Sequence, residues 1–277
     1  MSGYHVDALL HVANLDLRGR GIWRVFSEAY ATGRISITRP AEILLNANTV
    51  TVLVGFPIPP SGIGETDGPL GALCLAIALE SLGKYVRIIA DKSVLKALKE
   101  VWENTFSLSN ESVSEKDVIV AIEIPGRSKD GCYYSMRGVL ISPDPLDDII
   151  LKHVGSGRTV CIGDGGNEAG MGSLRDLIVK HVPLGDKIAS SVPADHVITG
   201  GTSNWAAYAL VGALSTLTSR NLLKEFNEQY YLRIMYDSGL IDGVLGRKSL
   251  SVDGIHEGTL KKVYDLMIDV VDRLIEG

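Results

Sequence analysis

Short apolar segments alternate with longer helical ones along most of the chain. The segments predicted as strands are β-branched and apolar: residues 49–54, 85–90, 117–124, 158–162 and 195–199. The segments with the length and periodicity of helices are residues 69–82, 92–103, 144–153, 171–181 and 204–217. Because strands that alternate with helices of about 10 to 15 residues form βαβ crossovers, this pattern predicts a parallel sheet.

The two ends of the chain carry additional helical patterns. Residues 7–32 predict two short helices with a break at Arg18-Gly19-Arg20-Gly21, and the C-terminal residues predict further helices that end in an amphipathic one. We therefore expect a single α/β domain with three layers, in which a mostly parallel sheet has helices on both faces and extra helices at both ends. Its parts would be an N-terminal helical segment (1–38), a motif-bearing core (39–217) and a C-terminal helical segment (218–277), together spanning residues 1–277.

The composition narrows the class of protein. Of the 277 residues, 45% are hydrophobic and 22% charged, which is typical of a soluble globular protein. A formal net charge of −6 without a lysine or arginine cluster argues against binding to nucleic acid or to anionic lipid. No apolar stretch approaches the roughly 20 residues that span a membrane. We therefore expect a small-molecule ligand and neither nucleic acid nor membrane as a partner.

The cysteines and the N-terminal sequence bear on the compartment. The three cysteines are widely spaced and include no Cys-x-x-Cys, which disfavours both a zinc site and an oxidising compartment. Polar residues such as Asp7 and His11 interrupt residues 1–16, which does not fit a signal peptide. We expect a cytoplasmic protein. Its long apolar helices favour a homo-oligomer, with a monomer as the alternative.

Glycine-rich polar segments follow most of the predicted strands. In an open parallel sheet, ligands bind in the crevice outside the carboxyl ends of the strands. The segments 55–69, 125–138, 163–172 and 200–204 should therefore converge there, together with Glu123. Bare glycines would let the backbone come close to a small ligand.

Carboxylates in these segments are the candidates for catalysis: Glu65, Asp67, Glu123, Asp164 and Glu168. Carboxylates that face one another raise one another's pKa values, as a base or acid working near neutrality requires. Asp67 has an alternative role as the N-cap of the helix that begins near Pro69. The oxygens of Asp67, Glu123 and Asp164 would also suit a divalent cation such as Mg²⁺ or Ca²⁺, and an ammonium group is the other occupant considered.

The segment after the fourth predicted strand has the spacing of a dinucleotide-binding loop with one important difference. Glu168 stands where the third glycine would be, and a carboxylate there would oppose a pyrophosphate. Gly165, Gly166 and Asn167 instead predict close contact with a small substrate, and a purely structural turn is the alternative.

Two further groups are predicted to bind substrate. Free N–H groups at the helix start formed by Thr202, Ser203 and Asn204 would hold a carboxylate or an oxyanion, although we expect one of these residues to cap the helix. Arg127 and Arg137 flank a loop with two tyrosines, and guanidinium groups suit carboxylates.

Four sequence segments, taken together, point to a known family. They are Gly-Phe-Pro at 55–57, Glu-Thr-Asp-Gly-Pro-Leu-Gly-Ala at 65–72, Glu-Ile-Pro-Gly-Arg-Ser-Lys-Asp-Gly-Cys-Tyr-Tyr-Ser-Met-Arg-Gly at 123–138, and Ile-Gly-Asp-Gly-Gly-Asn-Glu-Ala-Gly-Met-Gly at 162–172. This combination resembles the D-glutamate cyclase C-terminal domain family over roughly residues 39–217. The resemblance implies a hydro-lyase that closes D-glutamate to 5-oxo-D-proline with loss of water.

Such a ring closure needs a base, an oxyanion site and a holder for the substrate carboxylates, but it requires no cofactor. In this hypothesis, the five carboxylates of the protein lie at the substrate amine. The two arginines and the helix start bind the carboxylates of the substrate and the oxyanion. Two alternatives remain open. One is another hydrolase or lyase acting on a small amino acid or lactam, and the other is a non-catalytic module that binds an amino acid or a metal.

Overall fold

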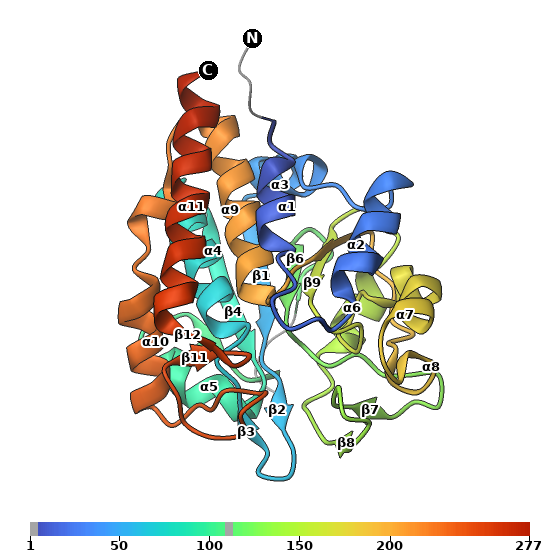
Figure 1. Cartoon of the computed structure of the whole chain (residues 1–277). Helices are drawn as coiled ribbons and strands as arrows, with labels where there is room; N and C mark the ends of the chain where they lie inside the picture. The colour runs from blue at the N-terminus through green and yellow to red at the C-terminus, as the bar shows by residue number, and fades with distance from the viewer. Residues whose placement is uncertain (1–4, 109–112) are drawn as a thin grey trace.

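A six-stranded parallel sheet forms the centre of the protein, with strand order β10-β9-β6-β1-β4-β5 (Figure 1). The computed structural model describes residues 5–108 and 113–277, so the first residues of the expected N-terminal segment lie outside it. The strands are β1 (Thr49–Val54), β4 (Tyr85–Ala90), β5 (Thr105–Phe106), β6 (Val118–Ile122), β9 (Thr159–Gly163) and β10 (His196–Thr199). Every strand pair in this sheet is parallel, which confirms the predicted α/β class.

One face of the sheet carries the larger hydrophobic core. Helices α4 (Pro69–Ser81) and α9 (Ser203–Thr218) pack on each other and on this face. Three more helices pack against α9, namely α1 (Ala8–Ala13), α3 (Thr38–Asn46) and α11 (Glu257–Glu276). In Figure 1 the C-terminal α11 and the N-terminal α1 lie on either side of α9. Both chain ends therefore contribute to the same core as the motif-bearing segment.

The opposite face of the sheet is covered around α6 (Asp147–His153). Ile149 and Ile150 of this helix are buried in a second hydrophobic cluster with Leu53 of β1 and Ile119 of β6. Strand β6 lies between the two cores and is buried along its whole length. This confirms the prediction of a sheet with helices on both faces.

Two of the five predicted core helices match the structure to within one residue at each end, and the other three differ more. Helix α5 (Lys92–Lys99) ends before residue 103, because the chain turns there into β5. Helix α6 begins at Asp147 and not at Asp144, which precedes Pro145 and is therefore biased away from the helical region. The expected helix 171–181 is split into η2 (Gly172–Leu174) and α7 (Arg175–His181).

The remaining elements surround the sheet: α2 (Ile22–Ala31), β2 (Pro57–Ile58), β3 (Ile63–Gly64), β7 (Tyr133–Tyr134), β8 (Leu140–Ile141), α8 (Gly185–Ile188), η3 (Leu222–Glu225), α10 (Glu228–Asp237), β11 (Ser251–Val252) and β12 (Ile255–His256). Within residues 5–108 and 113–277, no helix combines the length and the apolar character needed to cross a bilayer.

Glu228 at the start of α10 is a buried carboxylate outside the ligand-binding edge of the sheet. Burial raises its pKa to about 7, although the neighbouring Tyr208 and Lys261 lower it and Asp265 raises it further. The pKa of Glu228 in the folded protein lies above the unfolded value of 4.5. The contribution of this carboxyl group to stability is therefore complete below pH 4.5. The contribution is lost as the pH rises through about 7.

At about pH 8.5, we expect the free energy of unfolding of Glu228→Gln to be about 1–3 kcal/mol higher than that of wild type. At about pH 5, we expect little difference between the two proteins. Urea unfolding of both proteins at the two pH values measures this difference. The same difference at both pH values would contradict the assignment of a buried titrating group at this position.

Candidate functional site

A cavity of about 300 Å³ lies where the loops after β1, β6 and β9 meet, at the carboxyl edge of the sheet. Its lining residues are Arg18, Arg20, Phe56, Ile58, Pro59, Glu65, Glu123, Ser135, Met136, Arg137, Asp164, Glu168, Gly243, Val244 and Asp253. Four of the five predicted carboxylates line it, and the fifth, Asp67, has an oxygen within 4.8 Å of oxygens of Asp164 and Asp253. The structure therefore brings all five together.

Glu123 occupies a strained position directly after β6. Its φ of +49° lies in the left-handed region, which a residue with a long side chain seldom adopts. The Ser203 hydroxyl donates a hydrogen bond of 2.5 Å to its Oε2. Burial, followed by the negative charges of Glu168 and Asp164, raises the pKa of Glu123 well above its ordinary value. Strain of this kind is common where a side chain must point into an active site.

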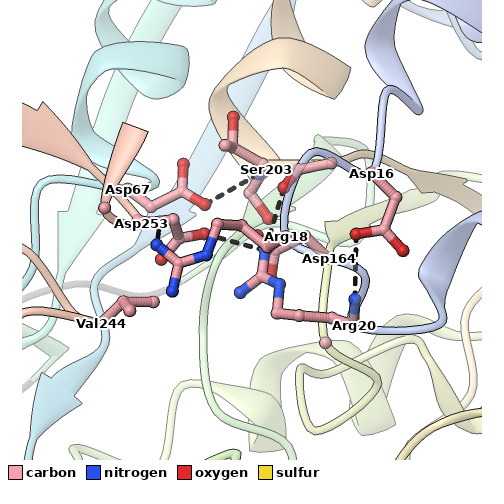
Figure 2. A network of polar contacts seen from close by, with 12 residues as sticks. Asp16, Arg18, Arg20, Asp67, Asp164, Ser203, Val244 and Asp253 are labelled. Atoms are coloured by element: carbon pink, nitrogen blue, oxygen red, sulfur yellow. Dashed lines mark hydrogen bonds and ion pairs between the residues drawn. The ribbon is translucent and has the colours of Figure 1, made fainter. Parts of the chain in front are cut away.

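Two helix starts cap each other beside the cavity. The Asp67 carboxylate accepts hydrogen bonds from the backbone N–H groups of Ser203 (2.8 Å) and Asn204 (2.9 Å), at the start of α9 (Figure 2). In return, Oδ1 of Asn204 accepts from the N–H groups of Gly68 (3.0 Å) and Gly71 (2.8 Å), at the start of α4. A side chain from the start of each helix therefore accepts hydrogen bonds from free N–H groups at the start of the other helix.

This arrangement corrects the expectation for the helix start at Thr202, Ser203 and Asn204. Its N–H groups are already occupied, two by Asp67 and that of Trp205 by the Thr202 hydroxyl. All three residues are buried, and none of them lines the cavity among the described residues. Of the three residues, Thr202 is the one whose side chain caps α9. Asp67 also accepts hydrogen bonds at the start of α9, and it is not the N-cap of its own helix, α4. The Ser203 hydroxyl donates its hydrogen bond to Glu123.

Replacing Asn204 by alanine is expected to lower the free energy of unfolding by about 2–3 kcal/mol. The substitution leaves the buried Gly71 N–H group without an acceptor and removes one of the two acceptors of the Gly68 N–H group, which keeps Oδ1 of Asp67. It also removes the hydrogen bond from Asn204 to the Thr66 carbonyl. Urea unfolding measures the change. Asn46→Ala is the matched control, because the exposed Asn46 side chain bonds only a carbonyl of its own helix. Equal losses in the two variants would contradict the capping role.

The glycine loop after β9 also binds a carboxylate of the protein itself. Glu168 accepts hydrogen bonds of 2.7 Å from the N–H groups of both Gly165 and Gly166. A Cβ at residue 165 would lie 2.4 Å from the Met136 sulfur, so the loop is tightly packed. Asn167 is buried and donates to the Tyr134 carbonyl. Gly165, Gly166 and Asn167 are not among the described residues that line the cavity, and their contact with substrate stays a prediction.

The two predicted arginines lie in different environments. Arg127 binds both oxygens of the buried Asp147 carboxylate, through Nε (2.8 Å) and Nη2 (2.9 Å), and Nη2 also contacts Asp148. It is not among the described lining residues, and its guanidinium is committed to α6. Arg137 does line the cavity, where its exposed side chain is held by a hydrogen bond to the Val244 carbonyl.

The sequence analysis missed three lining residues that come from the two ends of the chain. Arg20 Nη2 donates to Oδ2 of Asp164 (2.5 Å) and to Oδ2 of Asp253 (2.9 Å), and Arg18 donates to the Asp253 carbonyl (Figure 2). Asp253 and Gly254 form the turn between β11 and β12, with φ values of +53° and +73°. An Asp-Gly pair between apolar residues is a signal for such a hairpin, and it could have pointed to Asp253.

The cavity is strongly acidic. Glu65, Asp67, Glu123, Asp164, Glu168 and Asp253 are each at most 5% exposed. Burial is the largest cause that raises the pKa of Asp67 to about 7 and those of Asp164 and Asp253 to about 8. Burial and the neighbouring carboxylates also raise the pKa of Glu65 well above its ordinary value.

Arg20 is the cation that lies among these groups. Burial lowers the pKa of its guanidinium, but Asp164 and Asp253 raise it by more, so it stays charged. With several carboxylates around one guanidinium, the cavity can hold a further cation, such as an ammonium group or a metal ion, and can move protons near neutral pH. Two sets of oxygens lie within 4.8 Å of one another, those of Asp67, Asp164 and Asp253 and those of Glu123, Asp164 and Glu168.

Comparison with known proteins identifies a family for the chain. Residues 9–267 match a family described as D-glutamate cyclase-like, C-terminal. The chain is also similar to a protein of Homo sapiens named D-glutamate cyclase, mitochondrial, with 29% identity over 288 aligned positions. This alignment covers 80% of the chain and 46% of the human protein, so the chain spans about half the length of that relative.

Proposed function

The chain belongs to the D-glutamate cyclase-like C-terminal family, and from this membership and the acidic cavity we propose that it is a hydro-lyase that converts D-glutamate into 5-oxo-D-proline and water. The observation that carries the proposal is the distribution of charge in the cavity. Buried carboxylates would face the amine of the substrate, while Arg137 and Arg18 lie where they would bind its carboxylates.

The proposed reaction forms one bond and breaks another at the same carbon. The amine nitrogen bonds to the side-chain carboxyl carbon, and the bond from that carbon to one oxygen breaks. Two protons of the ammonium group leave with this oxygen as water, so no other reactant is needed. The protein has to carry protons from nitrogen to oxygen and to hold the substrate folded.

Glu123 is the carboxylate that we assign to this proton transfer. It lines the cavity, and its strained backbone fixes the direction of the side chain. The Ser203 hydroxyl holds one of its oxygens, which leaves the other oxygen for the substrate amine. A cavity of about 300 Å³ lies at the small end of the range for ligand pockets and suits an amino acid of this size.

The test is to incubate the purified chain with D-glutamate and, separately, with L-glutamate, and to follow 5-oxoproline by chiral chromatography and mass spectrometry. We expect 5-oxo-D-proline from the D-enantiomer and no comparable product from the L-enantiomer. Absence of product from both enantiomers, with the protein folded, would contradict the proposal.

A second candidate function is a non-catalytic module that binds an amino acid. One observation favours it: the aligned part covers less than half of the human relative, so the residues that complete the reaction in that protein would lie elsewhere. A rise in the thermal midpoint with D-glutamate, without formation of product, would support the binding module over the enzyme.

A further inference from the structure

Three arginines line the acidic cavity among the described residues, Arg18, Arg20 and Arg137, which is fewer than the number of carboxylates in and beside it. Six carboxylates, each at most 5% exposed, lie in or beside the cavity, and two of them, Asp164 and Asp253, pair with the guanidinium of Arg20. Buried charges in proteins are normally paired, or they coordinate a metal. The excess therefore has to be balanced either by protons or by a further cation.

Three of the carboxylates have the spacing of a ligand set. Oxygens of Asp67, Asp164 and Asp253 lie within 4.8 Å of one another. Arg20 Nη2 uses only Oδ2 of Asp164 and Oδ2 of Asp253, so one oxygen of each carboxylate remains for another cation. Three carboxylates around one guanidinium leave negative charge that a proton or a further cation has to balance.

A cluster of acids alone does not identify a ligand, but Glu65 adds an independent observation. Its side chain is 5% exposed and lines the same cavity, and no hydrogen bond or ion pair from the described residues reaches its carboxylate. A Cβ at Gly243 would lie 1.9 Å from its Oε2, so this carboxylate has room at the cavity wall because residue 243 is glycine. A buried carboxylate without a partner points to a cation as its missing partner.

The donors define the class of cation. All the candidate ligands are carboxylate oxygens, and no histidine or cysteine lines the cavity among residues 5–108 and 113–277. Hard cations such as Mg²⁺ and Mn²⁺ prefer oxygen ligands, whereas zinc and copper favour nitrogen and sulfur. Such an ion would also place a positive charge beside the carboxyl groups that the substrate presents.

We propose that this cavity binds one divalent cation of the Mg²⁺ and Mn²⁺ class, through the carboxylates of Asp67, Asp164 and Asp253, with the Glu65 carboxylate of the same cavity wall beside the ion. The proposal concerns binding by the protein itself. It would hold for an enzyme and for a binding module, so it does not depend on the cyclase reaction.

The experiment titrates the metal-free full-length chain with Mn²⁺ in the absence of any amino acid, and follows free Mn²⁺ by electron paramagnetic resonance. We expect one bound ion per chain, displaced by Mg²⁺. Glu65→Gln should weaken binding at least about tenfold. This variant should fold, because the replaced carboxylate is isosteric with the amide and has no partner to lose among the described residues. Asp164→Asn should weaken binding by a similar or larger factor.

Glu228→Gln is the matched control, because it removes a buried carboxylate from a different part of the protein. It should leave Mn²⁺ binding unchanged. Lack of binding up to about 1 mM Mn²⁺ would overturn the proposal and leave protons as the balancing charge. Binding that Glu65→Gln and Asp164→Asn do not weaken would also overturn it, since the ion would then lie at another site. Failure to form 5-oxoproline would count against the proposed reaction but not against the metal site.

Discussion

Glu123→Gln is expected to lower the rate of 5-oxoproline formation from D-glutamate by about 10²–10⁴-fold. Glutamine has nearly the same shape and can still accept the hydrogen bond from Ser203 through its amide oxygen, but it cannot take up and release a proton. The loss should therefore fall mainly on kcat, with a small change in KM. Initial rates over a range of D-glutamate concentrations separate the two constants.

The control for this prediction is again Glu228→Gln, which changes a buried carboxylate outside the cavity and should keep the wild-type rate. Both variants need the circular dichroism spectrum of the folded protein before their rates are compared. If Glu123→Gln kept a rate within about threefold of wild type, the proton transfer would have to be assigned to another carboxylate of the cavity.

Most of the central fold could be predicted from the sequence, because the strands of the sheet are buried and apolar. β1 and β4 have the predicted bounds, and β6, β9 and β10 differ from prediction by at most two residues at either end. β5 has only two residues, too few for a periodic signal. Helix ends were predicted less well, because they depend on local contacts such as that of Gly172, where a Cβ would lie 2.5 Å from the Val192 carbonyl oxygen.

The carboxylates of the site could be predicted because they directly follow strands that end at the same edge of the sheet. The sequence did not predict that the protein itself occupies the N–H donors beside these carboxylates. Both groups of free N–H donors that were assigned to a substrate are already filled by the protein, the start of α9 by Asp67 and the glycine loop by Glu168. A sequence pattern shows that such donors exist, but it does not show which carboxylate reaches them.

The contribution of the chain ends could not be predicted for a different reason. Arg20 is 144 residues from Asp164 and 233 residues from Asp253 in sequence. Nothing in the local pattern around Arg20 indicates these partners, since the same Arg-Gly alternation is equally consistent with a solvated break between two helices. The packing of α1 and α11 against α9 brings both chain ends to the site.

Replacing Arg20 by methionine is expected to lower the free energy of unfolding by about 3–5 kcal/mol at about pH 9, above the pKa values of about 8 of Asp164 and Asp253. Methionine keeps much of the length of the side chain but removes the guanidinium, so Asp164 and Asp253 lose the cation that lies 2.5 and 2.9 Å from their oxygens. Both carboxylates are at most 4% exposed, and water cannot replace the lost charge. Urea unfolding in the presence of a metal chelator measures the change without compensation by a bound ion.

Arg34→Met is the matched control, because Arg34 also forms a close ion pair, with Asp176, but at the surface, where the Asp176 side chain is 65% exposed. That variant should lose less than about 1 kcal/mol. Adding Asp253→Asn to Arg20→Met should recover part of the lost stability, because the second change removes one of the two unpaired carboxylates. Additive losses in the double variant would mean that Arg20 stabilises the protein by packing, whereas recovery would show that its charge balances the acidic cavity.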